Sequence, residues 1–127
     1  MKKLRQTYHI RAPLGRGWRV LVDVREIEEW GGGPAKMDSK VGTEFELWGG
    51  DIRGTNTEVV KEKKLAQEWI AGDWPEASRV TFTLEAEESG TKLVLDQDRI
   101  PDSEFEEIRD GWKEYYLGPI KEYLERT

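Results

Sequence analysis

The strongest constraint on the fold lies in residues 102–125, where apolar side chains recur at three- and four-residue spacing. The stripe consists of Phe105, Ile108, Trp112, Tyr115, Tyr116, Ile120, Tyr123 and Leu124. This spacing predicts one long amphipathic helix. Gly118-Pro119 should bend or interrupt it, because proline lacks a backbone N–H and clashes with the previous turn. A helix with so wide an aromatic stripe must bury it against a large apolar surface.

Six earlier segments have the composition and alternation of β-strands, namely residues 4–10, 44–48, 52–60, 65–71, 79–87 and 91–97. Turn sequences such as Gly49-Gly50-Asp51 and Glu88-Ser89-Gly90 separate them, which predicts a continuous antiparallel sheet. The alternation predicts a set of inward-facing residues: Phe45, Leu47, Leu65, Gln67, Trp69, Val80, Phe82, Leu84, Leu93 and Leu95. The concave face of this sheet is the surface on which the C-terminal helix can bury its stripe.

Two short helices are expected between the first and second strands. Pro13 stands where a helix can begin, because its missing N–H costs nothing in the first turn. One helical face then consists of Leu14, Trp18, Leu21 and Val22. Asp23 can cap a second helix over residues 24–30, which the Gly-Gly-Gly-Pro sequence at 31–34 ends. The order of elements predicts an α+β fold, and the length of 127 residues suits a single domain over residues 1–127.

Composition excludes several classes of protein. The net charge of −6 and the small size of the Lys clusters argue against nucleic acid as a partner. The sequence has no cysteine, so disulfides and thiolate metal sites are excluded. No apolar run approaches the roughly eighteen residues of a membrane span, and no apolar signal core follows Met1. We therefore expect a cytoplasmic protein that does not contact membranes.

Residues for catalysis or metal binding are hard to find. The one histidine, His9, falls on the polar face of the first strand, where a surface role is the simpler interpretation. Asp96, Asp98 and Asp102 resemble a set of cation ligands, but their segment lacks the glycine of a calcium loop and the later glutamate. We expect a solvated strand end there. The prediction is no catalytic residue, no metal, no cofactor and no enzymatic activity.

The surplus of aromatic residues has two interpretations. A cavity between sheet and helix would suit an apolar ligand, and its candidate ligand-binding residues are Tyr8, Trp18, Phe45, Gln67, Trp69, Phe82, Trp112 and Tyr116. The same residues would equally make the filled core of a small domain, and we favour a mainly filled core. Trp48, beside Gly49, and Trp74, in a loop, are harder to bury by pattern. We predict that they anchor a protein partner, although each could instead pack over a sheet edge.

An ordered set of short matches covers nearly the whole chain. The set is Ala12-Pro13, Trp18, Leu21, Trp30, Val41-Gly42, Phe45, Gly50-Asp51-Ile52, Gly54, Glu58, Lys64-Leu65, Trp69, Trp74-Pro75-Glu76, Gly90-Thr91, Leu93, Ile100-Pro101, Gly111-Trp112, Tyr115-Tyr116 and Ile120-Lys121. This set resembles the activators of the ninety-kilodalton heat-shock chaperone ATPase, and their C-terminal domain in particular. The resemblance implies a helix-grip (START-like, or SRPBCC) fold, in which the long helix lies across a curved antiparallel sheet.

The resemblance also implies a co-chaperone-like function, with a heat-shock chaperone as partner and a role in stress response. No part of the sequence matches the separate N-terminal domain of those activators, which argues against ATPase stimulation by this chain. Gly15, Gly17 and Thr43 also depart from the family pattern. The alternative function is a carrier or sensor of a small hydrophobic ligand. Catalysis within the cavity, as in cyclase-like relatives of the fold, would need an inward acid or base, and only glutamines and tyrosines are expected there.

Overall fold

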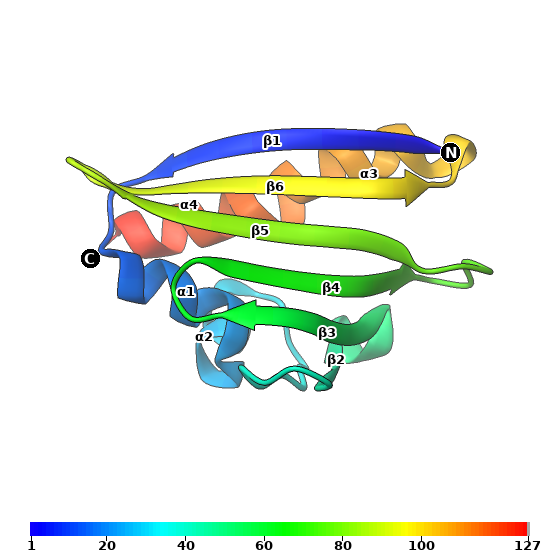
Figure 1. Cartoon of the computed structure of the whole chain (residues 1–127), viewed down its shortest axis with the longest axis horizontal. Coiled ribbons are helices and arrows are strands. Elements are labelled where there is room, and N and C mark those ends of the chain that lie inside the picture. Colours follow the sequence, from blue (N-terminus) through cyan, green and yellow to red (C-terminus); the bar gives the residue numbers. More distant parts are fainter. Residues whose placement is uncertain (127) are drawn as a thin grey trace.

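The structure, a computed structural model, describes residues 1–126. Six antiparallel strands form one sheet in the order β1-β6-β5-β4-β3-β2. The strands are β1 (Lys2–Ile10), β2 (Glu44–Leu47), β3 (Ile52–Val60), β4 (Lys64–Ala71), β5 (Ser78–Glu87) and β6 (Gly90–Ile100). The helices are α1 (Leu14–Val22), α2 (Val24–Trp30), α3 (Phe105–Gly111) and α4 (Leu117–Glu125). All helices lie on one side of the sheet, and the last two run across it (Figure 1), which confirms the predicted α+β architecture.

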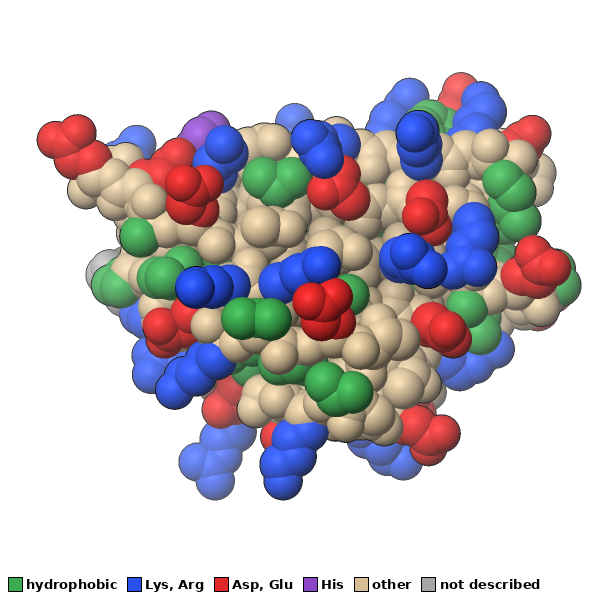
Figure 2. All heavy atoms as spheres, in the orientation of Figure 1, with side chains coloured by type: hydrophobic (Ala, Val, Ile, Leu, Met, Phe, Trp, Pro, Cys, Tyr) green, Lys and Arg blue, Asp and Glu red, His purple; other side chains and the backbone are tan. Residues whose placement is uncertain are grey.

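The strands alternate buried and exposed side chains as their sequences predict. In β5, Val80, Phe82 and Leu84 are buried, while Arg79, Thr83 and Glu85, which alternate with them, are exposed. The whole predicted inward-facing set is buried, including the polar Gln67. On the outer face of the sheet, basic and acidic side chains intermingle and hydrophobic ones form only small groups (Figure 2). The core therefore lies on one face only, between the sheet and the helices.

The two short helices close one end of the core. Asp23 caps α2 as predicted, since its carboxylate accepts hydrogen bonds from the backbone N–H groups of Arg25 at 2.8 Å and Glu26 at 3.3 Å. Trp30 is buried, and its indole N–H donates to the carbonyl of Val20 in α1 at 2.9 Å. This hydrogen bond ties the two helices together beneath the C-terminal helix.

The C-terminal helix is continuous in direction but changes its hydrogen-bonding pattern. A 3-10 turn at Asp102–Glu104 leads into α3, and a π-helical turn at Trp112–Tyr116 joins α3 to α4. Only Leu117 separates the π turn from Gly118-Pro119, where the sequence predicts an irregularity. Proline leaves one carbonyl of the previous turn without its usual donor. A side chain at Gly118 would lie 1.9 Å from the carbonyl oxygen of Lys113, so this turn requires glycine.

The π turn also corrects the predicted apolar stripe. Tyr115 was predicted to face the sheet, but 65% of it is exposed. Leu117, which the stripe omits, is fully buried. Both residues lie in or directly after the π turn, where the extra residue changes which side chains face the sheet. Within residues 1–126, no helix is long and apolar enough to cross a membrane.

Candidate functional site

A pocket of about 480 Å³ opens between the N-terminal half of the C-terminal helix and the ends of β3 and β4. Its volume lies within the range of about 300–1,000 Å³ that is usual for small-molecule sites. The 3-10 turn Trp48–Gly50, the loop after β4 and one face of α3 surround it. Its lining residues are Trp48, Asp51, Ile52, Trp69, Ala71, Gly72, Trp74, Glu104, Glu107, Ile108, Gly111, Trp112, Tyr115 and Tyr116.

Five aromatic rings form a continuous chain of contacts along this pocket. Trp48 meets Tyr116 edge-on with their centroids 5.8 Å apart, and Tyr116 lies 4.7 Å from Trp112. Trp112 stacks on Trp69 at 5.3 Å, and Trp69 lies 5.8 Å from Trp74. These separations are those of favourable aromatic pairs. The pocket therefore has a broad aromatic wall that is assembled from β4, its following loop, the turn after β2 and the helix.

The rings are held in place by hydrogen bonds from their indole N–H groups. Trp112 donates to the side-chain oxygen of the buried Gln97 at 2.7 Å, and Trp48 donates to the carbonyl of Gly31 at 2.7 Å. Trp74 donates to the carboxylate of Glu104 at 3.4 Å. Most indole N–H groups of the wall are thus engaged with protein acceptors. The exception is Trp69, whose buried indole N–H has no hydrogen-bond partner in the described part of the chain, so the rings offer the pocket mainly their π systems.

The polar groups at the pocket are acidic. Asp51 and Glu107 are exposed at its edge, while Glu104 is half-buried beside Trp74. Among the lining residues, all of which belong to the described part of the chain, there is no Lys, Arg or His. Burial raises the pKa of Tyr116 well above its ordinary value, so this hydroxyl stays neutral at physiological pH. The pocket therefore combines uncharged aromatic rings with carboxylates.

Three of the eight candidate ligand-binding residues line the pocket: Trp69, Trp112 and Tyr116. The other five lie outside it: Tyr8, Trp18, Phe45, Gln67 and Phe82. Phe82 packs edge-on against Trp112 at 5.8 Å and belongs to the filled core. The buried side-chain amide of Gln67 donates to the side-chain oxygen of Asn56 at 3.0 Å, so it hydrogen-bonds to a neighbouring strand and does not line the pocket. The space directly beneath Trp112 is filled, and the pocket lies beside it.

Trp48 and Trp74 also line the pocket, although the sequence suggested that they are hard to bury. Only 8% of Trp74 is exposed, because its ring packs against Trp69 over the end of β4. Trp48 is half-buried, with its ring edge-on to Trp30 at 6.0 Å. Packing over the sheet, the alternative interpretation, is thus the arrangement found for Trp74.

Sequence reasoning missed the helical side of the pocket. The sequence pattern assigns Tyr115 to the buried stripe, and it assigns Glu104 and Glu107 to no binding site. A signal was nevertheless present, because the three- and four-residue steps from Glu104 through Glu107, Ile108 and Gly111 to Tyr115 place these residues on one helical face. This face borders the predicted stripe and meets the open part of the sheet.

The described residues that line the pocket include no histidine, serine, threonine or lysine. His9 is exposed on β1, where its Nδ1 lies 2.9 Å from a carboxylate oxygen of Glu87, far along the chain from the lining residues. Residues 1–126 contain no group of three or more histidine, aspartate or glutamate side chains that could hold a metal ion. Asp96 pairs instead with Arg5 at 2.6 Å, and Asp102 with the N-terminal ammonium group at 3.0 Å.

Comparison with known proteins decides the family. The family model described as "Activator of Hsp90 ATPase homolog 1-like protein" matches residues 11–125. The chain belongs to this family. The part of the chain that matches the Hsp90-activator family therefore includes both short helices, the sheet from β2 onward and the whole C-terminal helix.

Individual Hsp90-activator relatives agree with this assignment. The activator of 90 kDa heat shock protein ATPase homolog 1 of Mus musculus is 32% identical over 107 residues, which cover 83% of this chain and 32% of that protein. The chain thus spans about a third of the length of the curated relatives that it matches.

Solved structures confirm the predicted helix-grip fold. The crystal structure of PFC0360w, an HSP90 activator from Plasmodium falciparum, has a TM-score of 0.89 and 28% identity, and the match covers 97% of this chain and 96% of that chain. Protein MLL2253 from Mesorhizobium loti has a TM-score of 0.82 and 26% identity, with 99% and 98% covered.

Proposed function

We propose that this chain is a non-enzymatic binding domain that associates with a chaperone of the Hsp90 class. The match to the Hsp90-activator family over residues 11–125 carries this proposal. The similarity to the Plasmodium falciparum HSP90 activator supports it, because 96% of that chain is covered by a domain of this kind. The described lining of the pocket has no histidine, serine or lysine that could act as a base or nucleophile, which favours a binding function over a catalytic one. A role in the stress response would follow from such a partner.

The test is direct binding to the Hsp90 of the same organism. We expect a complex in sedimentation velocity or isothermal titration calorimetry with the purified proteins. We expect weak or no stimulation of the chaperone ATPase, because the chain spans only about a third of the activator relatives. An unrelated acidic protein of similar size is the control for non-specific association. Absence of a complex together with an unchanged ATPase rate would contradict the proposal.

The pocket supports a second function, the binding of a small hydrophobic molecule. In this proposal Trp69, Trp112 and Tyr116 hold the ligand, and Trp48 and Trp74 complete the wall. Its volume of about 480 Å³ and its aromatic lining suit such a ligand. Because the pocket contains four tryptophans, a bound molecule should change the tryptophan emission spectrum. Titration with a panel of small apolar and aromatic compounds tests this function, and an unchanged emission throughout the panel would contradict it.

A further inference from the structure

Aromatic faces and carboxylates together define an unusual chemical environment in the pocket. Six of its lining residues are aromatic, and three are acidic: Asp51, Glu104 and Glu107. Aromatic rings concentrate negative charge on their faces and attract cations placed over them within about 6 Å. Carboxylates at the edge of a pocket also attract cations. Both features favour one class of ligand.

We propose that the pocket is selective for organic cations, in which an alkylated ammonium group is attached to an apolar or aromatic body. This inference rests on the proposed small-molecule function and adds the charge of the ligand to it. The apolar body would lie on the wall formed by Trp69, Trp112 and Tyr116, which is the buried part of the pocket. The ammonium group would lie against the ring of Trp74 and toward the carboxylates of Glu104 and Glu107.

The hydrogen bonds of the pocket support this choice of ligand. Glu104 already accepts the indole N–H of Trp74, so the carboxylate and the ring are fixed next to each other. Trp48 and Trp112 also donate to protein acceptors, so among the four indole N–H groups of the pocket only that of Trp69 lacks an acceptor and could serve an anionic or strongly accepting ligand. The lack of Lys, Arg and His among the described lining residues removes the usual partners of an anion. An alkylated ammonium needs few hydrogen bonds and loses little on entering such a site.

Electrostatics of the whole chain act in the same direction. The net charge of −6 raises the local concentration of cations around the protein at low salt. Since Glu107 and Asp51 are exposed, this contribution should weaken at high ionic strength, while the contribution of the buried rings should persist. Salt dependence can therefore separate the two parts of the attraction.

The decisive probe is a pair of ligands with the same shape and different charge. Benzyltrimethylammonium and its neutral carbon analogue, neopentylbenzene, differ in one central atom, so contact area is matched. We expect the cation to bind about tenfold more tightly than the analogue, which is the factor that a cation over aromatic faces supplies. Benzyl phosphonate, an anion of related shape, should bind more weakly than either. Tryptophan emission and isothermal titration calorimetry both measure these affinities.

Substitutions at the edge of the pocket locate the effect. The double variant Glu104→Gln, Glu107→Gln keeps the shapes of both side chains and an acceptor for Trp74. It should lower affinity for the cation about threefold at low salt and leave the neutral analogue unaffected. Glu106→Gln is the matched control, because Glu106 is exposed on the same helix but does not line the pocket. Trp74→Leu should lower the affinity for both the cation and the neutral analogue. Circular dichroism checks that each variant is folded.

Each result separates this inference from the two proposed functions. Equal affinity for cation and neutral analogue would overturn the charge selectivity while leaving an apolar ligand site in place. Failure of both ligands to bind would overturn the selectivity together with the small-molecule function. Neither result bears on the chaperone complex, which is measured without any ligand. Because Glu106→Gln removes one charge and the double variant removes two, a loss of binding free energy in Glu106→Gln of half that in the double variant or more would also overturn the inference, since it would reflect only net charge.

Discussion

The two halves of the C-terminal helix meet the sheet in different ways. In α4, Leu117, Ile120 and Leu124 are each at most 1% exposed, and they pack against β1, α1 and α2. In α3, none of the described residues is buried, and Phe105 and Ile108 are only partly covered. The π turn between the halves contributes Trp112 and Tyr116, which are the buried aromatic rings of the described C-terminal helix.

This difference shows how a small domain keeps both a stable core and an open site. The pocket arises where the helix stands away from the sheet and large aromatic rings span the remaining distance. Stability is therefore expected to depend on α4, and ligand binding on α3 and the π turn. Substitutions in the two halves can test this division.

The largest effect is expected from Ile120→Ala in the closed half. Ile120 is fully buried, so truncation removes apolar contacts and leaves a cavity, which should cost about 2–5 kcal/mol of unfolding free energy. Tyr115→Ala in the open half should cost no more than about 0.5 kcal/mol, because 65% of Tyr115 is exposed. Urea unfolding followed by circular dichroism measures both. Similar costs for the two variants would refute the division between the halves.

Gln97→Leu tests the link between the halves. The side chain of Gln97 accepts the Trp112 indole N–H at 2.7 Å and donates to the Ser78 hydroxyl at 3.1 Å. Leucine fills a similar volume but leaves the buried indole N–H unpaired, which should cost about 1–3 kcal/mol. The change should also shift the tryptophan emission. Gln97→Glu, which retains an acceptor, serves as a comparison; a stable Gln97→Leu with native emission would mean that packing alone positions Trp112.

The sheet could be predicted from the sequence, but most of the difference between the two halves of the C-terminal helix could not. Alternation along β4 and β5 identifies the buried faces because strand side chains alternate strictly, and Trp69 and Phe82 lie where the pattern puts them. The helix was predicted in place and length, and Tyr116, Ile120 and Leu124 are buried as the stripe predicts. Tyr115, however, is exposed, and the buried Leu117 was not part of the stripe. A π turn adds one residue without altering local composition, so periodicity alone does not reveal it.

A pocket was one of two interpretations of the aromatic residues, with a mainly filled core favoured, and the sequence did not indicate its location. Sequence indicates which residues are apolar, and it placed Trp18 and Trp112 together in one aromatic set. Only Trp112 lines the pocket, because α1 closes the opposite end of the core. Which end stays open depends on the distance between helix and sheet, which results from the packing of many residues. For the same reason Trp48 and Trp74, judged by pattern to be exposed anchors, lie in the pocket wall.

A third prediction concerns Tyr116, which lines the pocket but is buried like a residue of the closed half. Because burial raises its pKa, the folded protein keeps the proton above pH 10, where the unfolded chain releases it. The folded state then binds more protons, so stability should fall as pH rises above about 10, by about 1.4 kcal/mol per pH unit for this group. Tyr116→Phe should remove that part of the loss.

The measurement is urea unfolding of both proteins between pH 9 and pH 11. Other tyrosines add to the alkaline loss, since the pKa values of Tyr8 and Tyr123 are also raised. The comparison with Tyr116→Phe isolates one residue, and the pH 7 difference between the proteins is the baseline. An identical slope in both proteins would show that water reaches the Tyr116 hydroxyl through the pocket, which would place this residue in the open half.

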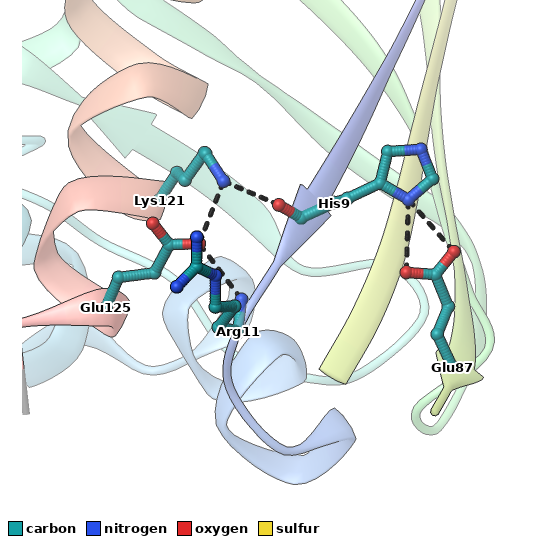
Figure 3. A network of polar contacts seen from close by, with 5 residues as sticks. All are labelled: His9, Arg11, Glu87, Lys121 and Glu125. Carbon is teal, nitrogen blue, oxygen red and sulfur yellow. Dashed lines mark hydrogen bonds and ion pairs between the residues drawn. The ribbon is translucent and has the colours of Figure 1, made fainter. Parts of the chain in front are cut away.

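The smallest effect is expected at the surface of the closed half, where a polar network joins α4 to the end of β1 (Figure 3). The Lys121 ammonium group donates to the carbonyl of His9 at 2.6 Å and to the Glu125 carboxylate at 2.8 Å. Glu125 also accepts the backbone N–H of Arg11 at 3.0 Å. Exposed ion pairs contribute little, so Lys121→Met should cost no more than about 1 kcal/mol at low salt and less at high salt.

Acid should reduce this contribution further. The hydrogen bond from Lys121, followed by that from the backbone of Arg11, lowers the pKa of Glu125 in the folded state. A lowered pKa stabilises the fold above the ordinary glutamate value of 4.5, and the stabilisation is lost as pH falls through the folded-state value. The difference between Lys121→Met and the unmodified chain should thus be larger at pH 7 than at pH 3. Lys113→Met, on the exposed side of the π turn, is the control. A Lys121→Met cost that approaches that of Ile120→Ala would mean that polar contacts, and not apolar packing, hold the closed half together.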